Sequence, residues 1–288
     1  MRPFTRTAPI KSLFNSHADG DHFMGNELVT SAEQIISTQA AYEEMIAGNP
    51  KAPLTLVSVG KWFSRFGKLG LTKMAQAGHW FQQMMAPYDL ESVTPTYPNR
   101  HFHNELRLDV GGRAVILYEV GPHHTHGDAI AYIPDAKILF AADLLFIGVP
   151  PPLWAGPAEN WLTALDRILE MDVDLYVPGH GPLVTDKGEI QPLKDYWEFF
   201  LEEVSQRHKA GLKPAEAAKS IALSPEFQLR PFGEWNSPER IMVSVHTQYR
   251  HLNGRTDSPG IPELLGIMRQ QALLAHAFPQ SEPNSMRL

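Results

Sequence analysis

Residues 15–22 read Asn-Ser-His-Ala-Asp-Gly-Asp-His, and this stretch places four side chains that can bind a metal within six residues. They are His17, Asp19, Asp21 and His22. A single His or Asp is more often a surface residue or a hydrogen-bonded core residue. Four in close succession, each costly to remove from water alone, are better explained by a partner that they share. The spacing H-x-D-x-D-H therefore predicts a metal site, with a solvated polar loop as the alternative.

The residues on either side place this stretch at the end of a strand. An apolar run that includes Leu13 and Phe14 predicts a buried strand before it, and residues 23–26 predict a turn into a helix after it. The loop between the carboxyl end of a strand and a helix is where α/β proteins usually carry their chemistry. We therefore expect the four side chains to point into a site.

Three further candidate ligands follow, each at or just past the end of an apolar run. His124 lies within Gly-Pro-His-His-Thr-His-Gly-Asp (121–128), which follows the apolar residues 114–120. Asp143 ends the apolar residues 139–143, and His180 lies within Gly-His-Gly, after residues 175–177. Strand ends that meet at one edge of a sheet would bring these side chains together.

With these motifs in this order, the sequence resembles the metallo-β-lactamase-fold hydrolase superfamily, over roughly residues 14–182. The signature of that superfamily is H-x-H-x-D-H, then H-T-x-G-D, a strand-end Asp and G-H-G. The resemblance implies an α/β fold, an αββα sandwich, here with a shortened N-terminal half and a C-terminal helical extension. We expect residues 1–185 to form this domain, with a helical insertion at about 54–97, and residues 186–288 to form a helical region packed on it.

The resemblance also implies a dinuclear metal site and a hydrolytic activity. The first metal would be bound by His17, Asp19 and His124, the second by Asp21, His22 and His180, with Asp143 bridging them. Two divalent cations, zinc above all, would lie roughly 3.5–4 Å apart and share a hydroxide that is available near neutral pH. Asp21 is the residue expected to orient this water and relay its proton.

Three features leave alternatives open. Asp19 stands where the superfamily most often has His, which favours manganese or iron at the first site, or leaves that site empty. His126 is the alternative to His124 in its motif. Only sixteen residues precede His17, so we expect the edge of the first sheet to be covered by another subunit, in a homo-oligomer, or by the C-terminal region.

The composition narrows the function. The 288 residues include no Cys, the net charge is −7 and 43% of residues are hydrophobic, which excludes thiolate sites and gives no electrostatic case for nucleic acid or membrane partners. A cytoplasmic protein with a small-molecule substrate is expected. Trp80 in the insertion, and Phe146 and Trp154 around the Pro-rich loop after Asp143, would line an apolar substrate pocket, unless they only pack the core.

We therefore predict hydrolysis of an ester, lactone or thioester, with weak β-lactam hydrolysis as a side activity. Two other hypotheses are an iron-dependent oxidoreductase of the same fold and a non-catalytic, truncated relative.

Several elements are predicted outside the motifs. Periodicity predicts a strand at 32–38 and helices at 39–46, 158–171, 190–209, 214–221 and 238–251. His101 and His103, interpreted as surface histidines, would begin a β meander that continues to residue 141. After Gly254 we expect a loosely docked helix followed by disorder.

Overall fold

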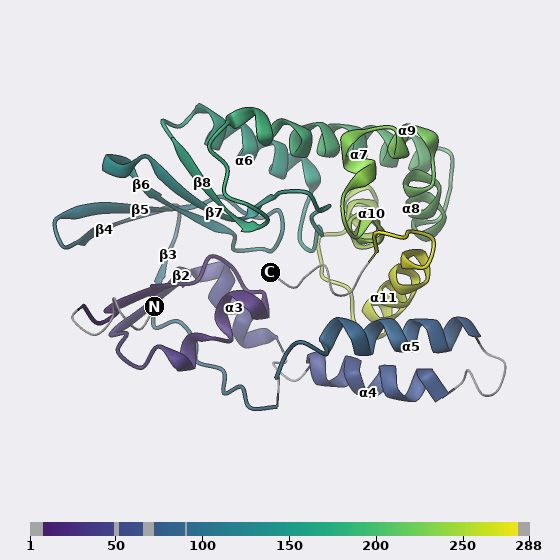
Figure 1. Cartoon of the computed structure of the whole chain (residues 1–288), viewed down its shortest axis with the longest axis horizontal. Helices are drawn as coiled ribbons and strands as arrows, with labels where there is room; N and C mark the ends of the chain where they lie inside the picture. Colours follow the sequence, from purple (N-terminus) through teal and green to yellow (C-terminus); the bar gives the residue numbers. More distant parts are fainter. Residues whose placement is uncertain (1–7, 49–51, 66–71, 90, 282–288) are drawn as a thin grey trace.

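In the computed structural model, which describes residues 8–48, 52–65, 72–89 and 91–281, two β-sheets pack face to face with helices outside both (Figure 1). The first sheet has three parallel strands in chain order, β1 (Ser12–Phe14), β2 (Gln34–Thr38) and β3 (Arg100–Phe102). The β-branched run of β2 favours extended backbone, and Ile36 is fully buried against Leu117 and Ala131 of the second sheet. The two sheets therefore share one apolar layer.

The second sheet holds five strands in sequence order, β4 to β8. They are β4 (Glu105–Val110), β5 (Arg113–Glu119), β6 (Ala129–Ile133), β7 (Ile138–Phe146) and β8 (Leu175–His180). Strands β4 to β7 form an antiparallel meander, and β8 returns parallel to β7. The parallel return follows helix α6 (Ala158–Glu170), whose buried stripe of Trp161, Leu165 and Ile168 faces the core.

The remaining helices come from both halves of the chain; in Figure 1, α3 lies beside the first sheet, whereas α4 and α5 lie beside α11. The N-terminal half contributes α2 (Gly20–Phe23), the 3-10 turn η1 (Asn26–Leu28), α3 (Gln39–Ala47), α4 (Ala52–Ser64) and α5 (Thr72–Met85). The C-terminal half contributes α7 (Gln191–Lys209), α8 (Pro214–Ala222), α9 (Pro225–Gln228), α10 (Ile241–Leu252) and α11 (Ile261–Ala275). Three-residue or four-residue 3-10 turns lie between elements at η3 (Pro134–Ala136), η4 (Lys187–Glu189), η5 (Pro231–Glu234) and η6 (Pro238–Arg240).

The insertion and the C-terminal helices belong to the same core as the sheet. Phe81 of α5, Leu139 of β7, Trp161 of α6, Trp197 of α7 and Ala272 of α11 are all fully buried in one hydrophobic cluster. The predicted αββα sandwich with a C-terminal helical extension is confirmed. Of the helices that the structure describes, none has the length and apolar character needed to cross a bilayer.

Two expectations about the fold are wrong. Strand β3, which contains His101, pairs with β2 in the first sheet and does not begin the meander. After it, Asn104 adopts a left-handed φ of 57°, which Asn tolerates, and the chain crosses to the second sheet there.

Helix α11, expected to be loosely docked, is firmly packed, because Ile267, Met268 and Ala272 are buried in the core. Residues 282–288 lie outside the described part of the chain.

Candidate metal centre

Backbone and side-chain hydrogen bonds fix the loop that carries the first four candidate ligands. The amide of Asn15 donates to Ile36 O (2.9 Å), and the Ser16 carbonyl accepts from Ala129 N (2.9 Å), so the loop is attached to both sheets. The Asn15 side-chain amide donates to His22 O and to the buried Asn26 Oδ1, each at 2.9 Å. These four hydrogen bonds hold the loop in place where it enters the site.

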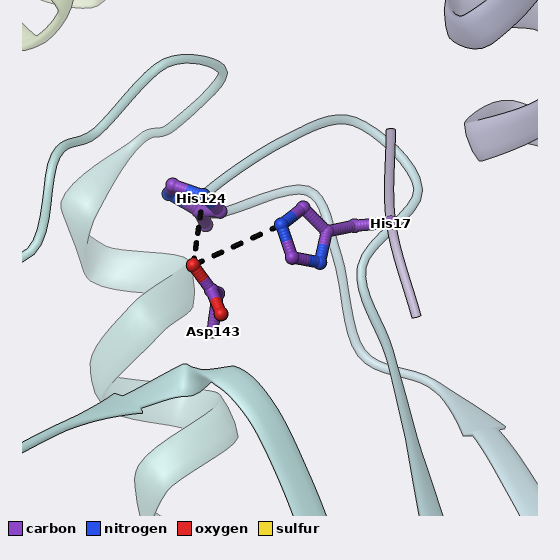
Figure 2. Close-up of side chains that lie close together, drawn as sticks. All are labelled: His17, His124 and Asp143. Atoms are coloured by element: carbon purple, nitrogen blue, oxygen red, sulfur yellow. Dashed lines mark ion pairs between the residues drawn. The ribbon is translucent and has the colours of Figure 1, made fainter. Parts of the chain in front are cut away.

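Two groups of possible ligand atoms converge beyond this loop. The first ligand group is His17, His124 and Asp143, and the second ligand group is Asp21, His22 and His180. In the first, Asp143 Oδ2 lies 3.8 Å from His17 Nε2 and 3.3 Å from His124 Nε2 (Figure 2). Asp19 Oδ2 lies 3.1 Å from His124 Nε2, so the unusual carboxylate of the motif reaches the first group as well.

The second ligand group is joined to the first through Asp143. Asp21 Oδ2 lies 3.4 Å from His22 Nε2 and 3.6 Å from His180 Nε2. Asp143 lies close to the same two rings, with Oδ1 3.2 Å from His22 Nε2 and Oδ2 3.3 Å from His180 Nε2. The structure thus brings all seven predicted ligand residues to one place, with one carboxylate between two groups.

The donors of this site fit a pair of metal ions. Among the described residues, His17 Nε2 and Asp143 Oδ1 are buried atoms that make no hydrogen bond, and each faces only another candidate ligand, Asp143 Oδ2 at 3.8 Å and His22 Nε2 at 3.2 Å. Buried polar atoms without partners are costly, and a cation between the rings and the carboxylate would satisfy both. Imidazole and carboxylate donors suit zinc, manganese and iron.

This arrangement agrees with a comparison to known families. The family model of the metallo-beta-lactamase superfamily matches residues 7–180. The chain belongs to the metallo-beta-lactamase superfamily.

Individual relatives are more distant. The linear primary-alkylsulfatase of Pseudomonas sp. is 22% identical over 243 residues, which is 75% of this chain and 43% of that protein. The 2,4-dinitroanisole O-demethylase subunit alpha of Nocardioides sp. is 36% identical over 80 residues, 26% of this chain and 23% of that protein. The stereoselective inverting sec-alkylsulfatase Pisa1 from Pseudomonas sp. superposes with a TM-score of 0.61 at 16% identity, covering 86% of this chain and 42% of that chain. This chain therefore spans less than half the length of these relatives, and the structural likeness concerns the fold.

In this member of the metallo-beta-lactamase superfamily, an irregular strand and a glycine position the Asp143 carboxylate between the two groups. Strand β7 shifts register against β8 on both sides of Ala142, whose φ is 46°, and this break turns the next side chain, Asp143, toward the site. Gly179, in the Gly-His-Gly motif, leaves the space that Asp143 fills, because a Cβ there would lie 1.9 Å from Asp143 Oδ1. The lack of a side chain at Gly179 thus allows the Asp143 carboxylate to occupy its position.

The rings of the ligand histidines are oriented by contacts behind them. His124 Nδ1 lies 2.7 Å from Pro152 O; a carbonyl can only accept, so Nδ1 carries a proton and Nε2 is the atom left for a metal. His180 stacks on Phe146, with ring centroids 4.8 Å apart and planes 20° apart. Ser16 Oγ lies 2.9 Å from His17 Nδ1. Each imidazole therefore presents Nε2 to the centre.

The other two histidines of the second motif have separate partners. His123 is fully buried, and its Nδ1 lies 2.8 Å from Asp128 Oδ2, which also accepts from Thr125 N at 2.9 Å. His126, the alternative ligand, lies outside the cluster with Nδ1 3.2 Å from Glu44 Oε1 on α3. Asp128 therefore holds the loop together, and His124 alone of the three reaches the centre.

The mutual proximity of these groups alters their protonation in the metal-free protein. Burial alone would lower the pKa of His22, but the Asp143 and Asp21 carboxylates outweigh it and raise that pKa to about 10. Burial would also lower the pKa of His124, but the Asp19 and Asp143 carboxylates outweigh this effect and raise that pKa to about 10. Burial would raise the pKa of Asp21, yet His22 lowers it to about 2, so this carboxylate stays ionised.

The three expected substrate-binding residues have different surroundings. Phe146 is 1% exposed and lies behind His180, and Trp80 is buried in the hydrophobic core. Trp154 is half-buried beside that core, and its amide donates to His124 O (2.9 Å). Phe146 and Trp80 therefore pack the protein interior, and Trp154 lies on the loop that contacts His124.

Sequence reasoning missed several residues around the centre. Pro152 acts through its carbonyl, which no residue type reveals. Burial raises the pKa of the Tyr88 phenol, just after α5, and lowers that of the Arg240 guanidinium, at the end of η6; the charge of Asp21 adds to the first shift and opposes the second. Tyr88 and Arg240 come from segments far from the motifs, so no pattern in the sequence links them to the site.

Proposed function

We propose that this protein is a metal-dependent hydrolase that cleaves an ester, lactone or thioester bond of a largely apolar small molecule. The observation that carries the proposal is the position of Asp143 between two groups of imidazole and carboxylate donors, with His17 Nε2 and Asp143 Oδ1 buried and without a hydrogen bond. When bound, two divalent cations, zinc above all, would supply hydroxide near neutral pH and polarise the scissile bond.

The protein groups have distinct roles in this proposal. His17, Asp19 and His124 would hold one cation, His22, His180 and Asp21 the other, and Asp143 both. Asp21 has the most open side chain of the second ligand group, 44% exposed, and its lowered pKa keeps it an acceptor. It would accept a hydrogen bond from the attacking water and so orient it toward the substrate.

A cavity in the insertion supports a substrate with an apolar part. It has a volume of about 240 Å³ and is lined on one side by Leu54, Val57 and Met85, and on the other by the polar residues Gln82, Asp89 and Glu91. Tyr88 also lines it; burial raises the pKa of the Tyr88 phenol, and the charge of Asp21 adds to this shift. The tail of a substrate could lie along this wall while its reacting bond lies at the metal centre.

A sulfate ester is a second candidate substrate. It is favoured by the alkylsulfatase relative, which aligns with 75% of this chain. The other hypotheses make different predictions. Weak β-lactam hydrolysis predicts turnover of a chromogenic cephalosporin. The redox hypothesis predicts a visible iron spectrum without ester hydrolysis, and the non-catalytic hypothesis predicts neither an iron spectrum nor turnover.

The test combines metal content with activity. Wild type purified without chelator should contain two equivalents of metal and hydrolyse members of a panel of 4-nitrophenyl esters, acyl lactones, thioesters, alkyl sulfates and a chromogenic cephalosporin. Asp143→Ala should lose both metals and turnover, because this carboxylate contacts both groups. Asp174→Ala, at an exposed position, is the matched control. Full activity in Asp143→Ala would refute the proposal.

We also propose that the protein is a homo-oligomer. In the described part of the chain β1 is an outer strand of the three-stranded sheet, and an open edge favours pairing with another chain. Light scattering coupled to size exclusion should give the mass of a dimer or larger; a monomer at micromolar concentration would contradict it.

A further inference from the structure

Strand β4 is an open edge of the five-stranded sheet. It stands at one end of the strand order, and β5 is the only strand paired with it among the residues that the structure describes. The β4–β5 hairpin lies at the left end of the molecule in Figure 1, away from the C-terminal helices. At the other edge, the outer side of β8 is partly covered, because Tyr176 and Val184 exchange two backbone hydrogen bonds (2.8 and 3.0 Å). Strand β4 is therefore where a further strand can join this sheet.

The hydrogen bonds of the hairpin show which backbone groups of β4 face the open edge. Glu119 N donates to Asn104 O (2.8 Å), so these two residues, which continue the register of the two strands, form a hydrogen-bonded pair. Hydrogen-bonded and non-hydrogen-bonded pairs alternate along an antiparallel ladder. The amide and carbonyl groups of Arg107 and Asp109 therefore point away from β5, toward the open edge.

The side chains of β4 form one charged face and one apolar face. The charged face is exposed and alternates in sign, with Glu105, Arg107 and Asp109. On the opposite face, Leu106 and Leu108 pack partly buried in the apolar layer between the two sheets. Val110 continues this apolar face but is 54% exposed. The open edge thus combines unpaired backbone groups, alternating charges and uncovered apolar surface.

The charges favour one register for an antiparallel pair of β4 strands. A two-fold axis at Arg107 would place this residue opposite itself and Glu105 opposite Asp109, so like charges would meet. An axis at Leu106 would place Glu105 opposite Arg107, but the Glu105 amide already donates to a carbonyl of its own chain (2.7 Å). An axis at Leu108 places Arg107 opposite Asp109 twice, and each such pair can exchange two backbone hydrogen bonds. Of these registers, only the one centred on Leu108 satisfies both the charges and the outward backbone groups.

Charges on an edge strand often keep two edges apart, which is the alternative explanation of this pattern. Strand β4 does not repel a second copy in the register centred on Leu108. Arg107 and Asp109 already have partners in their own chain, Glu105 and the amide of Gly112, and exposed ion pairs stabilise weakly. The charges therefore select the register, and the backbone hydrogen bonds and apolar burial supply the affinity.

We propose that two copies of this chain associate through their β4 strands, about a two-fold axis at Leu108, so that the two five-stranded sheets become one continuous sheet. Val110 of each copy would then lie opposite Leu106 of the other, which covers its exposed side chain and extends the apolar layer. The inference rests on the proposed homo-oligomer and not on the proposed hydrolysis, and it uses a different edge from β1.

Disulfide trapping reads the register directly, because the chain has no Cys. In Leu108→Cys the two thiols would face each other across the axis, with Cα atoms about 4.5 Å apart, which a disulfide can span. We expect this variant to form a covalent dimer under mild oxidation. Val110→Cys is the matched control on the same face, since its two copies would lie roughly 14 Å apart and should not be trapped. Trapping through Arg107→Cys but not through Leu108→Cys would overturn the proposal.

Light scattering coupled to size exclusion tests the charge pairs without a new bond. Arg107→Asp and Asp109→Arg should each raise the dimer Kd about tenfold, because each places like charges opposite one another twice. The double variant exchanges both charges and should return to within about threefold of wild type. Arg230→Asp, which exchanges an exposed Arg of the C-terminal half, is the control and should match wild type. Equal Kd values for wild type, both single variants and the double variant would overturn the proposal.

A proline variant guards against misfolding of the charge variants. Arg107→Pro removes an amide that points away from β5, so it should give a folded monomer, with the circular dichroism spectrum of wild type. A wild-type dimer whose mass Arg107→Pro does not change, without trapping in Leu108→Cys, would overturn the β4 interface and leave an oligomer through β1. A monomeric wild type without trapping in Leu108→Cys would overturn both interfaces and show that the charges of β4 keep its edge free.

Discussion

The two ligand groups of the centre differ in their access to solvent. The side chains of His17, His124 and Asp143 are at most 3% exposed, whereas those of Asp21, His22 and His180 are 44%, 19% and 30% exposed. The first group is enclosed by the two sheets and the Pro-rich loop, and the second is open to solvent. Under the proposed function, the first group would be the fixed part of the centre, and a substrate would approach from the side of the second.

The largest expected effect comes from removing what the two groups share. Gly179→Ala would place a Cβ 1.9 Å from Asp143 Oδ1, so the bridging carboxylate must move and both groups are disrupted. We expect loss of both metal equivalents and a drop in activity of about 10²-fold or more. Metal analysis and kinetics check it. Gly266→Ala in α11, where nothing lies within 4 Å, is the control and should leave both unchanged.

Metal binding by the two ligand groups should depend on pH in the same way. Each group contains a histidine whose pKa is raised to about 10 in the metal-free protein by neighbouring carboxylates, against burial: His124 in the first and His22 in the second. A metal must displace these protons, so its affinity should rise with pH, by about tenfold per pH unit for each proton released. Chelator competition at pH 6, 7 and 8 measures this; an affinity that does not vary with pH would contradict the assignment.

Metal exchange should distinguish the two groups. Because the second group is open, its metal should leave to a chelator about ten- to hundredfold faster than the metal of the first, giving two phases. His180→Ala should abolish the fast phase and His17→Ala the slow one. Stopped-flow with a coloured chelator follows both. A single phase in wild type would show that the difference in exposure has no kinetic consequence.

The smallest effect on metal binding is expected from a substitution in the residues that support His124 of the first ligand group. Ser244 Oγ of α10 accepts from Leu153 N (3.1 Å), and this holds the loop whose Pro152 carbonyl orients His124. Ser244→Ala should weaken metal binding at the first group by about tenfold and leave the second unchanged. Titration of the two sites checks it, with the exposed Ser220→Ala as control. Equal weakening of both sites would mean that α10 supports the centre as a whole.

The features of this molecule that could be predicted from the sequence are local ones. His17 to His22, His124, Asp143 and His180 each follow or end an apolar run, and motif spacing was sufficient to predict that these side chains gather. Asp143, which was predicted at a strand end, instead lies within β7 (Ile138–Phe146). Periodicity likewise placed most helices. These signals lie within a few residues of the feature that they indicate.

What depends on long-range packing could not be predicted. The partner of β3 is set by which sheet has a free edge beside β2, and nothing in the sequence around His101 records it. Burial of Phe146 behind His180 depends on the register break in β7. The bond from Asn236 N to Gly148 O, which attaches the segment before η6 to the loop after β7, is a backbone bond that any residue type could make.

The contacts of α10 with the Pro-rich loop have a practical consequence. Besides the Ser244 bond, His251 Nε2 lies 2.6 Å from Ala155 O, and Gln248 Oε1 accepts from Ala158 N (2.9 Å). Helix α10 of the C-terminal half thus holds the segment whose Pro152 carbonyl contacts His124. A shortened protein limited to residues 7–180, the part that matches the family model, would lack α10 and these contacts to the Pro-rich loop. Helix α10 therefore has to be kept when the protein is shortened or when that part is exchanged between homologues.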